Sequence, residues 1–186
     1  MHWPSELQPT DFEQIAFSDD QVVQVQKAKP LFTLWPGKSV ADTYNGKPIL
    51  DFQGRPGFAE LVILWSFEAA GWVGAWMDSY RRRTLRGYWP EPVFQEIPPR
   101  HNALLQNIAE AGAGESRPWD VFCWSPEAVI FVEAKRAKHD QIRRSQVAFL
   151  KAALETGVPA SAFLLVEWAA AEHVVAADVE PPARRR

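Results

Sequence analysis

Apolar positions in the middle of the chain follow a helical period in three places. Between residues 58 and 72 they recur at steps of three and four, which predicts an amphipathic helix that stops at Gly71. The same period predicts a helix over residues 140–155 and a shorter one around 103–110, with Gly112 after it.

Four other apolar runs are short and rich in β-branched or aromatic residues, which is typical of strands. They cover residues 72–77, 119–124, 129–134 and 162–168. Ser125-Pro126-Glu127 separates the middle two runs and is expected to form a hairpin turn. Helices and strands in this order predict an α/β domain over residues 56–168, with a mixed central β-sheet flanked by helices.

The two ends of the chain have a different pattern. Residues 1–55 mix short apolar runs with Pro and Gly, and Asn45-Gly46 is a hairpin signal, so an N-terminal β-rich arm is expected there. Residues 169–186 contain Pro181-Pro182 and three terminal arginines, and we expect them to form a disordered tail.

Composition indicates a globular protein, because 47% of the 186 residues are hydrophobic and 23% are charged. The single cysteine, Cys123, lies in an apolar run and has no partner for an internal disulfide, so the cytoplasm is the expected compartment. No apolar stretch reaches the roughly 18 residues of a membrane span, and the N-terminus lacks a signal-peptide pattern. Neither export nor a membrane partner is expected.

The net charge of −3 argues against a general nucleic-acid binder, but the basic residues are clustered. Residues predicted to contact phosphates are Arg81, Arg82, Arg83, Arg86, Arg136, Lys138 and Arg143. A run of charges is more often a solvated surface, so both interpretations stay open.

Polar side chains at the ends of two expected strands point to metal chemistry. Glu133 and Lys135 are two residues apart, so they project from the same face of a strand while Ala134 faces the opposite layer. In an antiparallel hairpin the start of the preceding strand, Asp120, lies beside them. Asp120, Glu133 and the backbone carbonyl of Ala134 suit Mg²⁺, with Mn²⁺ as a substitute.

Asp120 followed by Glu133-Ala134-Lys135 at the end of an apolar strand resembles the core motif of the PD-(D/E)XK nuclease superfamily. Glu60, at the start of the first helix, is similar to the glutamate that completes the acidic cluster in archaeal Holliday-junction resolvases. Gln146 resembles the glutamine of the VRR-NUC branch, and it also lies on the apolar stripe of its helix, where an amide needs a partner.

This resemblance implies a restriction-endonuclease-like fold and a Mg²⁺-dependent enzyme that hydrolyses DNA, with branched and single-stranded DNA among the candidate substrates. It also implies a homodimer. Asp120 and Glu133 would be metal ligands, Glu60 an outer acidic member of the cluster, Lys135 the charged catalytic residue and Gln146 its support. Three departures exist: Trp119 precedes Asp120 where the motif has Pro, about forty residues separate the first strand from Asp120, and residues 1–55 match no known segment.

Other interpretations of the same residues stay open. Glu60 could be a first-turn residue favoured by the helix dipole, and Gln146 could hydrogen-bond the backbone as part of the fold. The chain could keep the nuclease fold as a non-catalytic nucleic-acid-binding or assembly module. It could also be a structural protein in which Lys135 forms a buried salt bridge with its carboxylate neighbours.

Overall fold

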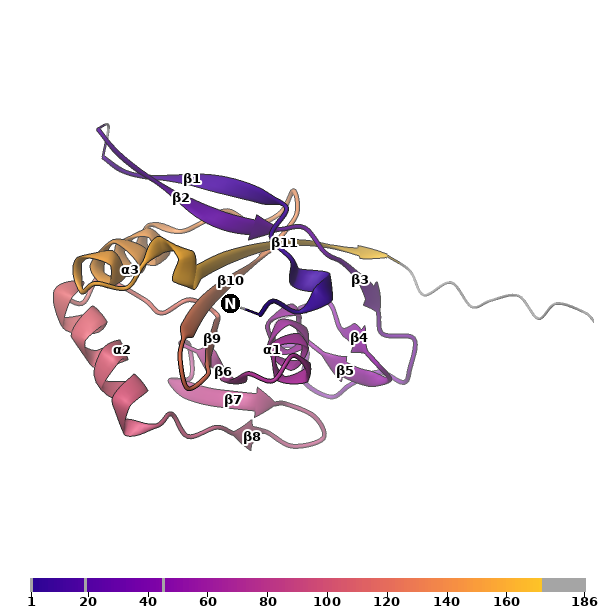
Figure 1. Ribbon diagram of the computed structural model, residues 1–186. Coiled ribbons are helices and arrows are strands. Elements are labelled where there is room, and N and C mark those ends of the chain that lie inside the picture. Colours follow the sequence, from indigo (N-terminus) through magenta and orange to yellow (C-terminus); the bar gives the residue numbers. More distant parts are fainter. Residues whose placement is uncertain (1, 19, 45, 172–186) are drawn as a thin grey trace, which may run out of the picture.

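The structure is a computed structural model and describes residues 2–18, 20–44 and 46–171. Within them the chain forms three α-helices and eleven β-strands (Figure 1). The helices are α1 (Ala59–Ala69), α2 (Pro99–Ala111) and α3 (Arg144–Glu155), with short 3₁₀ helices at Ser5–Leu7 and Ala160–Ala162. The strands are β1 (Asp11–Ser18), β2 (Gln21–Ala28), β3 (Leu31–Leu34), β4 (Leu50–Phe52), β5 (Arg55–Gly57), β6 (Val73–Asp78), β7 (Arg83–Gly87), β8 (Val93–Phe94), β9 (Val121–Trp124), β10 (Val129–Arg136) and β11 (Phe163–Ala171).

A single mixed sheet joins these strands. Nine of them follow the order β5-β4-β3-β11-β10-β9-β6-β7-β8, while β1 and β2 lie off this path. Strands β9 and β10 form the expected antiparallel hairpin, in which Val121 pairs with Val132. Strands β10 and β11 run parallel and are connected through α3, which makes a β-α-β unit. The predicted α/β class with a mixed sheet is therefore confirmed.

Helices cover both faces of the sheet (Figure 1). Helix α1 packs on one face, against Cys123, Ile130 and Val132, while α2 and α3 cover the other face, where Phe122 and Phe131 lie. Successive residues of a strand point to opposite faces, so each central strand supplies both layers of the core. Among the described residues no helix is long and apolar enough to cross a membrane.

Residues of the expected N-terminal arm contribute strands β1 to β5. Strands β1 and β2 form a long hairpin, and β2 and then β3 pair in parallel with β11, on the edge away from β10. Pro30 lies between β2 and β3, where a residue without an N–H suits a break in the ladder. Much of this segment therefore extends the central sheet.

Two local predictions fall partly outside the described residues. The hairpin expected at Asn45-Gly46 includes one such residue, Asn45. A tight turn lies at Gln53-Gly54, where both residues have the positive φ that a two-residue hairpin loop requires. Of the tail expected over residues 169–186, residues 169–171 pair with β3 and belong to the sheet, which corrects that part of the prediction. Residues 172–186 lie outside the described part.

Helix α3 starts at Arg144 and not at Asp140 as its apolar pattern suggested. Asp140 instead accepts a hydrogen bond from the backbone N–H of Arg136 at 3.0 Å, which closes the turn after β10. The Gln146 side chain accepts one from the backbone N–H of Arg143 at 2.8 Å. Because this bond satisfies an N–H that the first helical turn leaves free, it sets where α3 begins.

Candidate active-site cleft

A cleft of about 860 Å³ opens where β9 begins and β10 ends, beside the start of α3. All five residues predicted to be catalytic line it: Glu60, Asp120, Glu133, Lys135 and Gln146. They come from α1, β10, α3 and the residue before β9, so only the folded sheet brings them together.

Glu133, Lys135 and Gln146 form a closed set of contacts on the floor of the cleft. The Lys135 ammonium donates to Glu133 Oε1 at 2.8 Å and to Gln146 Oε1 at 3.0 Å, and Gln146 Nε2 donates to the same Glu133 oxygen at 2.5 Å. Glu133 is 1% exposed and Lys135 7%. The inward orientation of Gln146 that its place in the helix predicted is confirmed.

Asp120 lies beside this set, as the antiparallel hairpin predicted. Its Oδ2 accepts a hydrogen bond from the backbone N–H of Ala134 at 3.1 Å. Its own backbone carbonyl accepts one from the N–H of Met77 at 2.7 Å, which ties the residue to β6. The Asp120 side chain is therefore held against the end of β10 by two neighbouring strands.

Glu60 is a buried first-turn residue of α1 that forms an ion pair with Lys47. The Lys47 ammonium also lies 5.3 to 5.6 Å from the ring centroids of Tyr44, Phe58 and Trp76. Such contacts with aromatic faces stabilise a cation in a partly buried place. Lys47 comes from the loop between β3 and β4, and no pattern in the sequence marks it as part of the site.

Asp78 is a third buried carboxylate at the cleft, after Glu60 and Glu133, and the sequence alone did not predict it. It accepts a hydrogen bond from the Tyr44 hydroxyl and pairs with the Arg83 guanidinium at 3.1 Å. In the same loop as Tyr44, Asp42 accepts one from the Tyr88 hydroxyl at 2.5 Å. These bonds hold the loop that carries Lys47 over the cleft. The available signal was an Asp that directly follows the apolar run of β6.

The carboxyl groups of the cleft influence one another's protonation. Burial, together with the neighbouring Asp120, raises the pKa of Glu133 well above its usual value, even though Lys135 works in the opposite direction. Burial and Asp120 also raise the pKa of Glu60, against the effect of Lys47. Burial by itself would lower the pKa of Lys47, but Glu60 raises it above its ordinary value. Negative charge is therefore crowded at this end of the sheet.

The side chains fit a divalent cation in one specific respect. Glu133 Oε2 is buried and has no hydrogen-bond partner, whereas Oε1 of the same carboxylate has two. A buried carboxylate oxygen without a partner is costly, and a bound metal ion would satisfy it. The described residues contain no group of three or more His, Cys, Asp or Glu side chains placed to hold a metal ion. A metal here would therefore depend on backbone or water oxygens as well.

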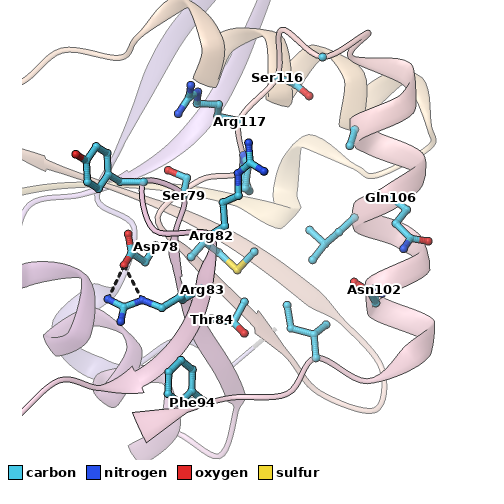
Figure 2. A pocket seen from close by; sticks show the side chains of 17 residues that line it. Asp78, Ser79, Arg82, Arg83, Thr84, Phe94, Asn102, Gln106, Ser116 and Arg117 are labelled. Atoms are coloured by element: carbon cyan, nitrogen blue, oxygen red, sulfur yellow. Dashed lines mark hydrogen bonds and ion pairs between the residues drawn. The ribbon is translucent and has the colours of Figure 1, made fainter. Parts of the chain in front are cut away.

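Most of the predicted phosphate-contacting residues have other partners or other places. Three of them pair with carboxylates: Arg81 with Asp42 at 3.4 Å, Arg83 with Asp78 at 3.1 Å and Arg86 with Glu68 at 3.0 Å. Arg143 lines the cleft and Lys138 is exposed in the turn after β10. Arg136 borders a third, smaller cavity of about 280 Å³. Arg82 lines a different cavity, shown in Figure 2.

Searches against protein-family models, curated proteins and solved structures find no match to this chain. The function of the cleft therefore has to be argued from its own side chains.

Proposed function

We propose that this protein is a metal-dependent nuclease of the PD-(D/E)XK type, with a restriction-endonuclease-like core, that hydrolyses phosphodiester bonds in DNA. One observation carries the proposal: one oxygen of the buried Glu133 carboxylate is held by Lys135 and Gln146, while the other has no hydrogen-bond partner, in a cleft that Asp120 also lines. A purely structural salt bridge does not explain an unpartnered buried oxygen.

Asp120 and Glu133, with the main-chain carbonyl of Ala134, would hold Mg²⁺ or Mn²⁺, and Glu60 supplies a further negative charge nearby. Both ions prefer oxygen ligands and keep several waters, so two carboxylates suffice. When bound, such an ion acts as a Lewis acid toward a phosphodiester and lowers the pKa of water.

Lys135 provides a fixed positive charge on the floor of the cleft. Its contacts with Glu133 and Gln146 limit the directions in which the ammonium can move. From there it can orient a water molecule toward the phosphorus or stabilise the charge that gathers on the phosphoryl oxygens. Gln146 does not touch the substrate in this scheme; it positions the Lys135 ammonium and the Glu133 carboxylate relative to each other.

The test is cleavage of supercoiled plasmid, linear duplex, branched and single-stranded DNA with Mg²⁺, with Mn²⁺ and with EDTA. We expect cleavage only with metal, and its loss in Lys135→Ala. Asp140→Asn is the matched control, because Asp140 lines the same cleft but does not contact Glu133 or Lys135. Circular dichroism checks that each variant is folded. Wild-type cleavage rates in Lys135→Ala, or cleavage that persists in EDTA, would overturn the proposal.

A second candidate is a nucleic-acid-binding or assembly module that keeps this fold without catalysis. The observation that favours it is the ion pair of Lys47 with Glu60, which gives one of the carboxylates a protein cation as its partner. DNA binding that persists in EDTA, with no cleavage under either metal, would select this candidate over the nuclease.

A further inference from the structure

A second cavity, of about 920 Å³, lies directly beside the acidic cleft. It is bounded by the β6–β7 hairpin, by β8 and by one face of α2 (Figure 2). Six residues line both cavities and form the border between them: Met77, Asp78, Ser79, Tyr80, Arg117 and Pro118. A chain molecule bound in one cavity can therefore continue into the other.

The charged side chains that line this second cavity are mainly positive, whereas carboxylates outnumber cations in the acidic cleft. Three arginines and a single carboxylate line it, and that carboxylate, Asp78, is already paired with Arg83. Arg82 and Arg117 are exposed, and within the described part of the chain neither guanidinium has a hydrogen-bond or ion-pair partner. Figure 2 shows them entering from two segments, the β6–β7 turn and the loop before β9.

Its other walls offer flat apolar and amide surfaces. Phe94 lines the cavity although 65% of its surface is exposed, and Tyr80, at the border with the cleft, is 83% exposed. Asn102 and Gln106 lie one turn apart on the face of α2 that borders the cavity (Figure 2), and Leu105 lines the same cavity. Large aromatic side chains left open to solvent at a concave surface indicate a binding surface.

We propose that this cavity binds an unpaired nucleotide of a DNA single strand whose neighbouring phosphate lies in the acidic cleft. Sites for single-stranded nucleic acid combine cationic side chains that follow the backbone with aromatic rings on which bases stack. Here Arg82 and Arg117 take phosphates, and Phe94 and Tyr80 take base faces. The amides of Asn102 and Gln106 on α2 can hydrogen-bond the edges of bases. In a duplex those edges are paired and the bases are stacked, so the amides cannot reach them. The placement of the strand rests on the nuclease function proposed for the cleft.

The test is fluorescence anisotropy in EDTA with fluorescein-labelled oligodeoxythymidine and with a blunt-ended duplex of the same length. We expect tighter binding of the single strand by the wild type. Phe94→Ala should weaken single-strand binding about fivefold or more. Arg82→Gln and Arg117→Gln should each lower the slope of log affinity against log salt by about 0.7. Arg86→Gln is the matched control. It removes the same charge, but Arg86 lies on β7, does not line the cavity and pairs with Glu68.

Equal affinity of the wild type for single strand and duplex would overturn this proposal, as would Arg86→Gln matching the effects of the other two arginine variants. The nuclease proposal fails separately. Metal-dependent cleavage of DNA without any effect of Phe94→Ala on single-strand binding would keep the nuclease and refute the nucleotide site. Single-strand binding that depends on Phe94, without cleavage under either metal, would keep the nucleotide site and refute the nuclease.

Discussion

Replacing Asp120 by Asn tests the cleft in both its metal-free and its metal-loaded form. The substitution removes a negative charge and keeps an oxygen that can accept the hydrogen bond from the Ala134 N–H. Asp120 raises the pKa of both Glu133 and Glu60 in the folded protein. A glutamate whose pKa is raised by folding contributes stability below its unfolded pKa and loses it as pH rises through the folded value. The metal-free wild type should therefore lose stability toward neutral pH, and the variant should lose less.

The expected effect differs between the two forms. Without metal the variant should be more stable than the wild type at neutral pH, because it lacks the negative charge that raises the pKa of Glu133 and Glu60. With Mg²⁺ at a hundred times its dissociation constant the wild type gains about 2.7 kcal/mol. For a chain of this size that raises Tm by about 5 to 10 °C. The variant, with one ligand weakened, should show little of this rise.

The assay is thermal unfolding over a range of pH in EDTA, and then with Mg²⁺ or Mn²⁺. Asp140→Asn is the control, because Asp140 makes the same kind of hydrogen bond, to the N–H of Arg136, at the same cleft. Calorimetric titration of metal into both variants and the wild type measures binding directly. An equal rise in Tm for the wild type and Asp120→Asn would refute Asp120 as a ligand. If the metal-free variant were less stable than the wild type at neutral pH, the negative charge of Asp120 would not destabilise the cleft through Glu133 and Glu60.

Three further predictions follow from single contacts. Gln146→Leu loses the bonds to Glu133, Lys135 and the start of α3, so urea unfolding should show a loss of about 2 kcal/mol, and cleavage should fall with it. Tyr44→Phe removes the hydroxyl that bonds Asp78, so the loop before β4 should be cut faster in limited proteolysis, while an unchanged rate would show that this bond does not hold the loop. Burial raises the pKa of the Cys123 thiol, so Ellman's reagent should react only after denaturation.

Short-range periodicity was sufficient to predict that Asp120, Glu133, Lys135 and Gln146 lie together. Alternate residues of a strand lie on one face, so Glu133 and Lys135 project together. The short antiparallel hairpin places Asp120, at the start of its first strand, beside the end of its second. The helical period put Gln146 on the inner stripe of α3. Each of these relations joins residues within about one turn or one hairpin of each other, where chain geometry decides the contact.

The rest depended on contacts between distant segments. Strands β2 and β3 join the sheet by pairing with β11, and Tyr44 and Lys47 reach the cleft in a loop with no periodic pattern. Basic residues that look alike in sequence also separate in space: Arg86 pairs with Glu68, and Arg82 faces an open cavity. Which surface such a segment meets depends on packing and charge across the whole domain, so residue identity alone could not determine it. The sequence by itself determined the acidic motif, and the tertiary structure decided what surrounds it.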